Sequence, residues 1–192
     1  MSFRSTIVPL LLLGALAACD RQDSAGEQAN AVAPANSAQS VGGEKVIVDT
    51  IGTLDRSHKG EAAPTLPFEA PDGSKTSIAA FAGKPVLVNL WATWCAPCVA
   101  EMPTLDKVAE RMQVVAISQD LKGAEQVDPF FAKAGLKNIK RYLDPGVTLS
   151  VAYQASLPTS ILYDAAGKEV WRMTGGMDWT SATAGELLAE AS

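Results

Sequence analysis

Cysteine and histidine are scarce in this chain, which has three cysteines and one histidine among 192 residues. A closed structural zinc site takes four Cys or His ligands in most cases. Cys95 and Cys98 are three positions apart, whereas Cys19 and His58 lie far from them in the sequence. A closed zinc site therefore cannot be completed around the pair. Cu(I), which two soft ligands can hold, remains an alternative.

An excess of basic residues is also lacking, since 16 Lys and Arg face 21 Asp and Glu, for a formal net charge of -5. Without a basic patch or stripe, the sequence predicts no nucleic-acid partner. Charge is nearly absent from residues 1–18, where Arg4 precedes the apolar run "IVPLLLLGALAA". That run is short for a membrane span but fits the apolar region of a secretory signal. We therefore expect residues 1–18 to be a signal peptide.

The end of this segment, Leu16-Ala17-Ala18-Cys19, resembles the bacterial lipoprotein box. The resemblance implies cleavage before Cys19, which would become the first mature residue and carry the lipid. Asp20 then resembles an inner-membrane retention signal. An ordinary signal peptide with a chance cysteine is the alternative. After Cys19, residues up to 43 hold few large apolar side chains, so 19–43 is expected to be the lipidated cysteine and a flexible linker.

Apolar patterning predicts alternating strands and helices in the rest of the chain. Residues 44–63 are expected to be an N-terminal extension, with a strand over 45–51 and then a polar loop. In the domain expected over 64–192, Asp72-Gly73 indicates a hairpin, and 77–81 a helical turn. The later expected strands cover 85–93, 113–120, 140–145 as an edge strand, and the two sides of a turn at 165–167. The expected helices run from after Cys95 to about Arg111, over 124–136, over 147–155, and over 179–192 with Asp178 or Thr180 as the cap.

The cysteine pair stands where the first central strand meets its helix. This order of elements is that of the thioredoxin fold, an α/β class with a central mixed sheet flanked by helices, here with an N-terminal β-hairpin extension. A helix N-terminus favours the thiolate of Cys95, and Cys98, one turn later, is placed to act as a resolving thiol. A purely structural disulfide would close a very small loop and gain little stability. A redox pair therefore fits better than a structural one.

Longer blocks carry a family resemblance. "GKPVLVNLWATWCAPCVAEMP", together with "SLPTSILYD" and the later Gly167, resembles the TlpA/ResA-like branch of the thioredoxin superfamily over about 64–192. These are exported, membrane-tethered bacterial thiol-disulfide oxidoreductases. The resemblance implies that Cys95 attacks, that Cys98 resolves, and that the two form a redox-active disulfide. It also implies that Ala96 and Pro97 influence the reduction potential.

Two prolines and two tryptophans also match the family. Pro103 matches a proline that kinks the active-site helix. In Leu157-Pro158-Thr159, Pro158 matches a cis-proline that faces the cysteines and exposes peptide groups to a substrate chain. An ordinary trans proline at a strand start is the alternative. Trp94 is expected to cover the disulfide, and Trp91 to pack in the core.

The buried aspartate of ordinary thioredoxins is replaced here by Asn89, which cannot titrate. Glu101, three positions after Cys98 on the same helix, matches an acidic residue that this branch places near the active site. The resemblance implies that Glu101 accepts the proton of Cys98 when a mixed disulfide resolves. The alternative is a solvated helix glutamate that pairs with a surface charge such as Lys107.

Together these features predict a lipid-anchored reductase that faces the periplasm, with the inner membrane favoured. The family resemblance implies that its substrates are disulfide-bearing exported proteins, in cytochrome c maturation or copper-site assembly, and that a DsbD/CcdA-type transmembrane protein recharges it. We expect a monomer without a cofactor or a metal site. The alternatives are a disulfide-forming oxidase or isomerase and a non-catalytic Cu(I)-binding assembly module. A thiol peroxidase is disfavoured because the chain lacks an isolated peroxidatic cysteine in a Thr-x-x-Cys setting.

Overall fold

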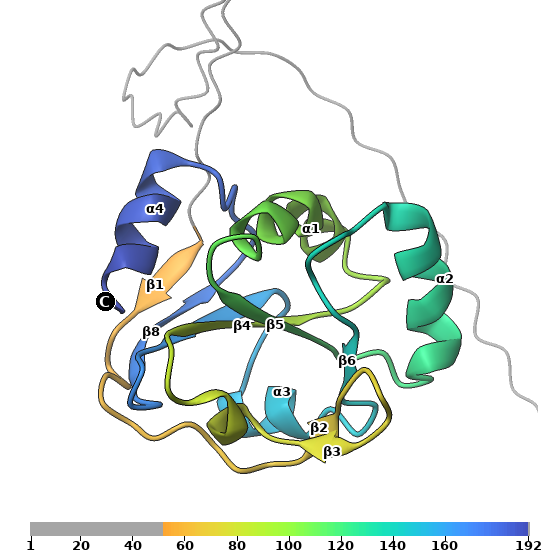
Figure 1. Cartoon of the computed structure of the whole chain (residues 1–192), viewed down its shortest axis with the longest axis horizontal. Helices are drawn as coiled ribbons and strands as arrows, with labels where there is room; N and C mark the ends of the chain where they lie inside the picture. Colours follow the sequence, from red (N-terminus) through yellow and green to blue (C-terminus); the bar gives the residue numbers. More distant parts are fainter. Residues whose placement is uncertain (1–51, 192) are drawn as a thin grey trace, which may run out of the picture. The chain divides into compact units, whose positions relative to one another are not determined.

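One sheet of eight strands organises residues 52–191, the part of the chain that the computed structural model describes (Figure 1). Its strand order is β1-β8-β7-β4-β5-β6-β2-β3. The strands are β1 (Thr53–Asp55), β2 (Phe68–Glu69), β3 (Lys75–Thr76), β4 (Val86–Trp91), β5 (Gln113–Ser118), β6 (Tyr142–Leu143), β7 (Thr159–Tyr163) and β8 (Glu169–Thr174). The helices are the 3-10 turn η1 (Ile78–Phe81), α1 (Ala96–Val108), α2 (Ala124–Ala134), α3 (Thr148–Tyr153) and α4 (Ala182–Ala189). The predicted fold class is confirmed.

β4 lies near the centre of the sheet, between β7 and β5, and all six of its residues are buried. A strand covered on both faces needs such a continuous run, in which Asn89 is the one polar residue. β4 pairs in parallel with β5 and antiparallel with β7, and Asn89 is in register with Ala116 on one side and Ser160 on the other. Asn89 is thereby fixed in the middle of the sheet, below the start of α1.

Helices cover both faces of the sheet. In Figure 1, α1, α2 and α4 lie on one face, and α3 lies on the other. One apolar cluster includes Leu105 of α1, Val127 of α2 and Leu187 of α4, and a second includes Ile78 of η1 and Leu149 of α3. Burial of each such large side chain contributes about 1.5–3 kcal/mol, so the two clusters hold the helices against the sheet.

Two predicted features at the rims of the sheet were wrong. Tyr142–Leu143 is not an edge strand, because the hairpin formed by β2 and β3 adds to it, with Glu69 paired to Leu143. Residues 53–55, expected in a polar loop, form β1 and pair antiparallel with β8. The strand expected over 45–51 lies outside the described residues. In both places the strand is two or three residues long, too short for a hydrophobic pattern to appear.

The predicted N-cap of the last helix was also wrong. Asp178 or Thr180 was expected, but the N-cap is Ser181. α4 begins at Ala182, and the hydroxyl of Ser181 accepts a hydrogen bond from the backbone N–H of Ala184 at 3.1 Å. Asp178 instead accepts hydrogen bonds from the backbone N–H and the hydroxyl of Thr180. Asp178 therefore shapes the turn before the helix, and Ser181 caps the helix itself.

Candidate active site

Cys95 and Cys98 form a disulfide at the N-terminus of α1, with Cα atoms 5.3 Å apart. Cys95 is the N-cap residue, and its Sγ accepts a hydrogen bond from the backbone N–H of Cys98 at 3.3 Å. The side chains differ in exposure, because 6% of Cys95 is exposed and none of Cys98. Cys95 therefore keeps a small exposed surface, whereas Cys98 is wholly shielded from solvent.

The local sequence explains why a helix starts here. The apolar strand β4 ends at Trp91, and a short loop brings the chain to Cys95. Pro97 stands within the first two helical positions, where a missing N–H costs nothing and the fixed φ favours a helix. Farther along, α1 continues through Pro103. The exposed N–H groups at the start of α1 would stabilise a thiolate on Cys95.

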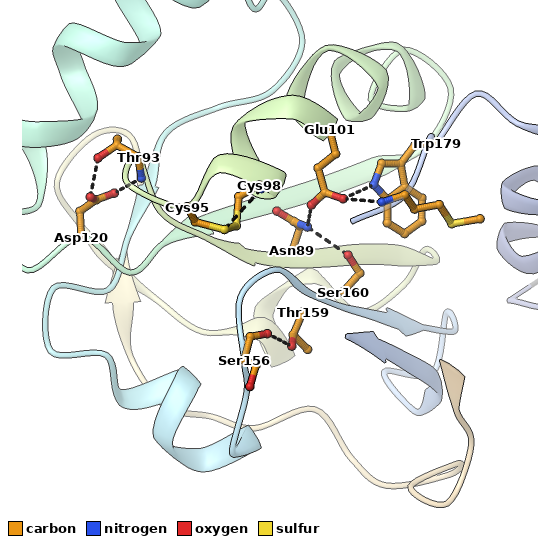
Figure 2. Close-up of a disulfide and its surroundings, with 11 residues drawn as sticks. Asn89, Thr93, Cys95, Cys98, Glu101, Asp120, Ser156, Thr159, Ser160 and Trp179 are labelled. Atoms are coloured by element: carbon orange, nitrogen blue, oxygen red, sulfur yellow. Dashed lines mark hydrogen bonds between the residues drawn. A yellow bond between two sulfur atoms is a disulfide. The ribbon is translucent and has the colours of Figure 1, made fainter. Parts of the chain in front are cut away.

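Glu101 lies on α1 one turn after Cys98 and is buried, with only 4% of it exposed. One oxygen, Oε1, accepts a hydrogen bond from Nδ2 of Asn89 at 2.8 Å. The other, Oε2, accepts from the backbone N–H of Met177 and from Nε1 of Trp179, both at 3.1 Å. Figure 2 shows this carboxyl group between the side chain of Asn89 and the indole of Trp179. The alternative prediction, a solvated Glu101 paired with a surface charge such as Lys107, is therefore wrong.

Burial changes the acidity of this carboxyl group. Loss of water raises the pKa of Glu101 from 4.5 to about 7, against the opposing effect of the hydrogen bonds from Asn89, Met177 and Trp179. An acid of this pKa gains and loses a proton near neutral pH, as a general base must. Sequence reasoning had placed Glu101 near the cysteines, but it had not found Met177 and Trp179, which follow it by more than 70 residues.

A second buried carboxyl group was missed. Asp120, fully buried after β5, accepts hydrogen bonds from the backbone N–H of Thr93 at 2.9 Å and from the Thr93 hydroxyl at 2.6 Å (Figure 2). It also accepts from the hydroxyl of Ser118 at 2.7 Å. Asp120 thus anchors the loop that carries Cys95. The available signal was its place at the carboxyl end of β5, beside the end of β4 in a parallel pair.

The remaining predicted site residues are placed as follows. The Leu157–Pro158 peptide bond is cis, and Pro158 directly precedes β7. Thr159 is buried, and its hydroxyl donates to the carbonyl of Ser156 at 2.6 Å (Figure 2). Trp94 is 66% exposed, so its indole is open to a partner chain, and its expected role over the disulfide stays a prediction. Trp91 is fully buried.

A cavity of about 560 Å³ opens beside Glu101. Its lining includes Pro97 and Thr104 of α1 and Gly176, Met177 and Asp178 of the segment before α4. The cavity reaches from the start of the active-site helix to the buried carboxyl group, which gives a proton on Glu101 a route toward solvent.

Neither a metal cluster nor a membrane span is found among residues 52–191. No three Asp, Glu, His or Cys side chains of that part are arranged to hold a metal ion. No helix within it has both the length and the apolar character that crossing a bilayer requires.

Comparisons with known proteins agree on one family. The Redoxin family model matches residues 58–188. The thiol-disulfide oxidoreductase ResA of Bacillus thuringiensis is 30% identical over 125 residues, covering 60% of this chain and 69% of ResA. The thioredoxin-like protein YneN of Bacillus subtilis is 41% identical over 64 residues, which are 31% of this chain and 38% of YneN.

Solved structures agree. The exposed lipoprotein thioredoxin of Streptococcus pneumoniae superimposes with a TM-score of 0.55 at 25% identity, covering 65% of this chain and 98% of that structure. The residues that the Redoxin model matches include the cysteine pair, α1 and the central strands of the sheet. The chain therefore belongs to the Redoxin family, and within it to the TlpA/ResA-like thiol-disulfide oxidoreductases.

Proposed function

We propose that this protein reduces disulfides in exported proteins on the periplasmic side of a membrane to which a lipid on Cys19 attaches it. The observation that carries the proposal is the arrangement at the start of α1, where Cys95, with 6% of it exposed, the fully buried Cys98 and the buried Glu101 follow one another at intervals of three residues. Thiol-disulfide exchange needs one sulfur to attack, one to resolve and one base to take a proton.

The reaction begins from the dithiol form. The thiolate of Cys95 attacks one sulfur of a substrate disulfide, which makes a mixed disulfide and releases the other substrate sulfur as a thiolate. Cys98 then gives its proton to Glu101, and its thiolate attacks Sγ of Cys95. The second substrate sulfur leaves, so the substrate gains two electrons and the Cys95–Cys98 disulfide forms. Glu101 then releases its proton to solvent, and we propose that a DsbD/CcdA-type transmembrane protein returns two electrons, with one proton taken up on Cys98, which restores the starting form.

The location is argued from the sequence. Residues 1–18 have the pattern of a signal peptide that ends before Cys19. One structural relative is named an exposed lipoprotein thioredoxin, which supports the same attachment for this chain. The inner membrane is favoured by Asp20. An exported dithiol needs a reductant supply because the periplasm is oxidising, and attachment to the membrane that holds the supply would shorten the path for electrons.

The substrates that fit best are exported proteins whose cysteines must be reduced before a haem or a copper ion is attached. Cys95 follows the exposed Trp94 in the chain, and we propose that a polypeptide bound at Cys95 contacts this indole. The protein is proposed to act as a monomer on such chains.

The reduction potential of the Cys95–Cys98 pair decides the direction of electron flow. The protein would be equilibrated against glutathione or dithiothreitol, with Trp fluorescence as the signal. We expect a value near or below about -270 mV, that of thioredoxin. A value near about -120 mV, that of a strong oxidant, would reverse the proposal and favour the disulfide-forming oxidase.

Substrates can then be captured with Cys98→Ala, which leaves the attacking sulfur but removes the resolving one. We expect this variant to accumulate mixed disulfides with periplasmic proteins that hold haem-attachment or copper-site cysteines. The control is a variant with both Cys95 and Cys98 replaced by Ala. Equal capture by the double variant would show that Cys95 is not the attacking sulfur.

A further inference from the structure

Asn89 lies among buried polar side chains, between Glu101 of α1 and Ser160 of β7. It is fully buried, and its place in β4 is fixed by backbone pairing with Ala116 and Ser160 on the two neighbouring strands. Its side chain is the only polar one in an otherwise apolar strand. A buried amide in such a strand carries a desolvation cost of a few kcal/mol unless hydrogen bonds offset it, so its partners are informative.

The amide is satisfied on its nitrogen alone. Nδ2 donates to Oε1 of Glu101 at 2.8 Å and to the hydroxyl of Ser160 at 3.0 Å. Figure 2 shows both bonds leaving the nitrogen, with the carbonyl oxygen turned away from Glu101. That oxygen, Oδ1, is buried and has no hydrogen-bond partner among the described residues. An unpaired buried acceptor of this kind calls for an explanation.

The three partners of the Glu101 carboxyl group differ in what they can do. The backbone N–H of Met177 and Nε1 of Trp179 can only donate. They suit an ionised carboxylate, which only accepts. When Glu101 takes a proton, its new O–H needs an acceptor, and Asn89 is the one partner that has an acceptor as well as a donor. A rotation of the amide by about 180° brings Oδ1 to the position now held by Nδ2.

We propose that Asn89 is a positioning residue whose amide rotates when Glu101 gains or loses its proton, so that each state of Glu101 is hydrogen-bonded. This inference rests on the proposed role of Glu101 as the proton acceptor of Cys98. With Glu101 ionised, Nδ2 donates to Oε1 and to Ser160. After the proton moves from the Cys98 sulfur to Oε1, Oδ1 accepts from the Glu101 O–H and from the Ser160 hydroxyl, which turns from acceptor to donor.

Among the groups around Glu101, Asn89 is the one whose hydrogen bonding changes when Glu101 gains or loses its proton. The titratable groups near it include Cys98, one turn earlier on α1, and Asp178, which lines the same cavity and lies near the positive charge of Lys107. The carboxyl group of Asp178 is held by Thr180, and its pKa lies below the usual value because of those bonds. An aspartate in place of Asn89 would place a second negative charge next to ionised Glu101. An apolar residue there could form a hydrogen bond with neither the ionised nor the protonated carboxyl group.

The first test measures the proton affinity of Glu101 in the full chain by NMR of ¹³C-labelled carboxyl groups. The signal is assigned by its absence in Glu101→Gln. Asn89→Leu removes the hydrogen bond that Asn89 makes to ionised Glu101 and the one that it makes to protonated Glu101. The bond to the ionised form is charge-assisted and therefore the stronger, so its loss favours protonation. We expect about a fivefold higher proton affinity in Asn89→Leu. Ser118→Ala, which removes a buried hydroxyl bonded to Asp120, should leave it unchanged. An unchanged or lower affinity in Asn89→Leu would overturn the inference.

The second test needs no substitution and reads the rotation itself. In the wild-type chain, nuclear Overhauser effects should connect the amide protons of Asn89 to the β protons of Ser160 at pH 9 and be lost at pH 5. Effects of equal strength at both pH values would show a fixed amide and overturn the rotation. Neither test uses turnover. If Glu101→Gln exchanged disulfides at the wild-type rate, the proposed role of Glu101 would fail while the coupling of Asn89 to its proton could still be seen.

Discussion

The buried carboxyl group of Glu101 has a pKa of about 7, and this makes the free energy of unfolding depend on pH. In the unfolded chain the same group titrates near 4.5. Between these two values the folded protein binds more protons than the unfolded one, so the free energy of unfolding falls as the pH rises. The contribution is fully present below pH 4.5, and about 3 kcal/mol of it is lost once the pH has passed 7.

Glu101→Gln removes this titration. We expect the free energy of unfolding of the variant, relative to wild type, to rise by about 3 kcal/mol between pH 4.5 and pH 8. Urea unfolding of the oxidised proteins at several pH values measures the difference. Glu186→Gln, which changes an exposed carboxyl group of α4, is the control and should follow wild type. Parallel curves for Glu101→Gln and wild type would show that Glu101 titrates normally in the fold.

Sequence reasoning at the residue scale depended on spacing along the chain. Cys95, Cys98 and Glu101 share one helix, and their spacing placed them together. Trp179 could not be found in this way, because its bond to Glu101 depends on how the segment between β8 and α4 folds back over α1. Asp120 was missed for the same reason, since its partner Thr93 comes from a different loop.

At the scale of elements, the approach of β1 to β8 depends on glycine. A Cβ on Gly52 would lie 2.3 Å from the carbonyl oxygen of Thr174, a distance that forces the backbone to move. Gly175, next in the chain, has a φ of +109°, which side chains rarely adopt. By contrast, a Cβ on Gly185 within α4 meets nothing within 4 Å. The two sites therefore predict opposite effects of the same change.

Gly52→Ala should destabilise the protein by about 1–3 kcal/mol, because the added methyl group strains the pairing of β1 with β8. Gly185→Ala should stabilise it by up to about 1 kcal/mol, because alanine favours a helix over glycine. Thermal unfolding of both variants beside wild type measures the contrast. A melting temperature that Gly52→Ala leaves unchanged would mean that β1 can separate from the sheet without cost.

These elements also show which parts of the fold a sequence can predict. The apolar run of β4 and the helical spacing of α1 are long enough to identify each element, and both were placed correctly. β1, β2, β3 and β6 have two or three residues each, and their pairing depends on the neighbouring strand. For that reason β1 was expected to be a loop, and β6 to lie at an edge.

At the scale of the whole molecule, folding and oxidation are linked. If the fold favours the disulfide over the dithiol more than the unfolded chain does, the oxidised protein must be the more stable form, and each 30 mV of potential corresponds to about 1.4 kcal/mol. Two features oppose each other. The N-terminus of α1 favours a thiolate on Cys95 and so the reduced form. The full burial of Cys98 keeps its S–H group away from water once the disulfide is reduced, and so favours the oxidised form.

For a reductant we expect burial to outweigh the helix terminus, so that the oxidised protein unfolds at a higher urea concentration than the reduced protein at pH 7. The measurement compares urea unfolding with and without dithiothreitol. The variant with both Cys95 and Cys98 changed to Ser controls for the reagent and should show no difference. If the reduced form were the more stable one, as in strongly oxidising relatives of the fold, electrons would flow from substrate to protein, and the direction proposed here would be wrong.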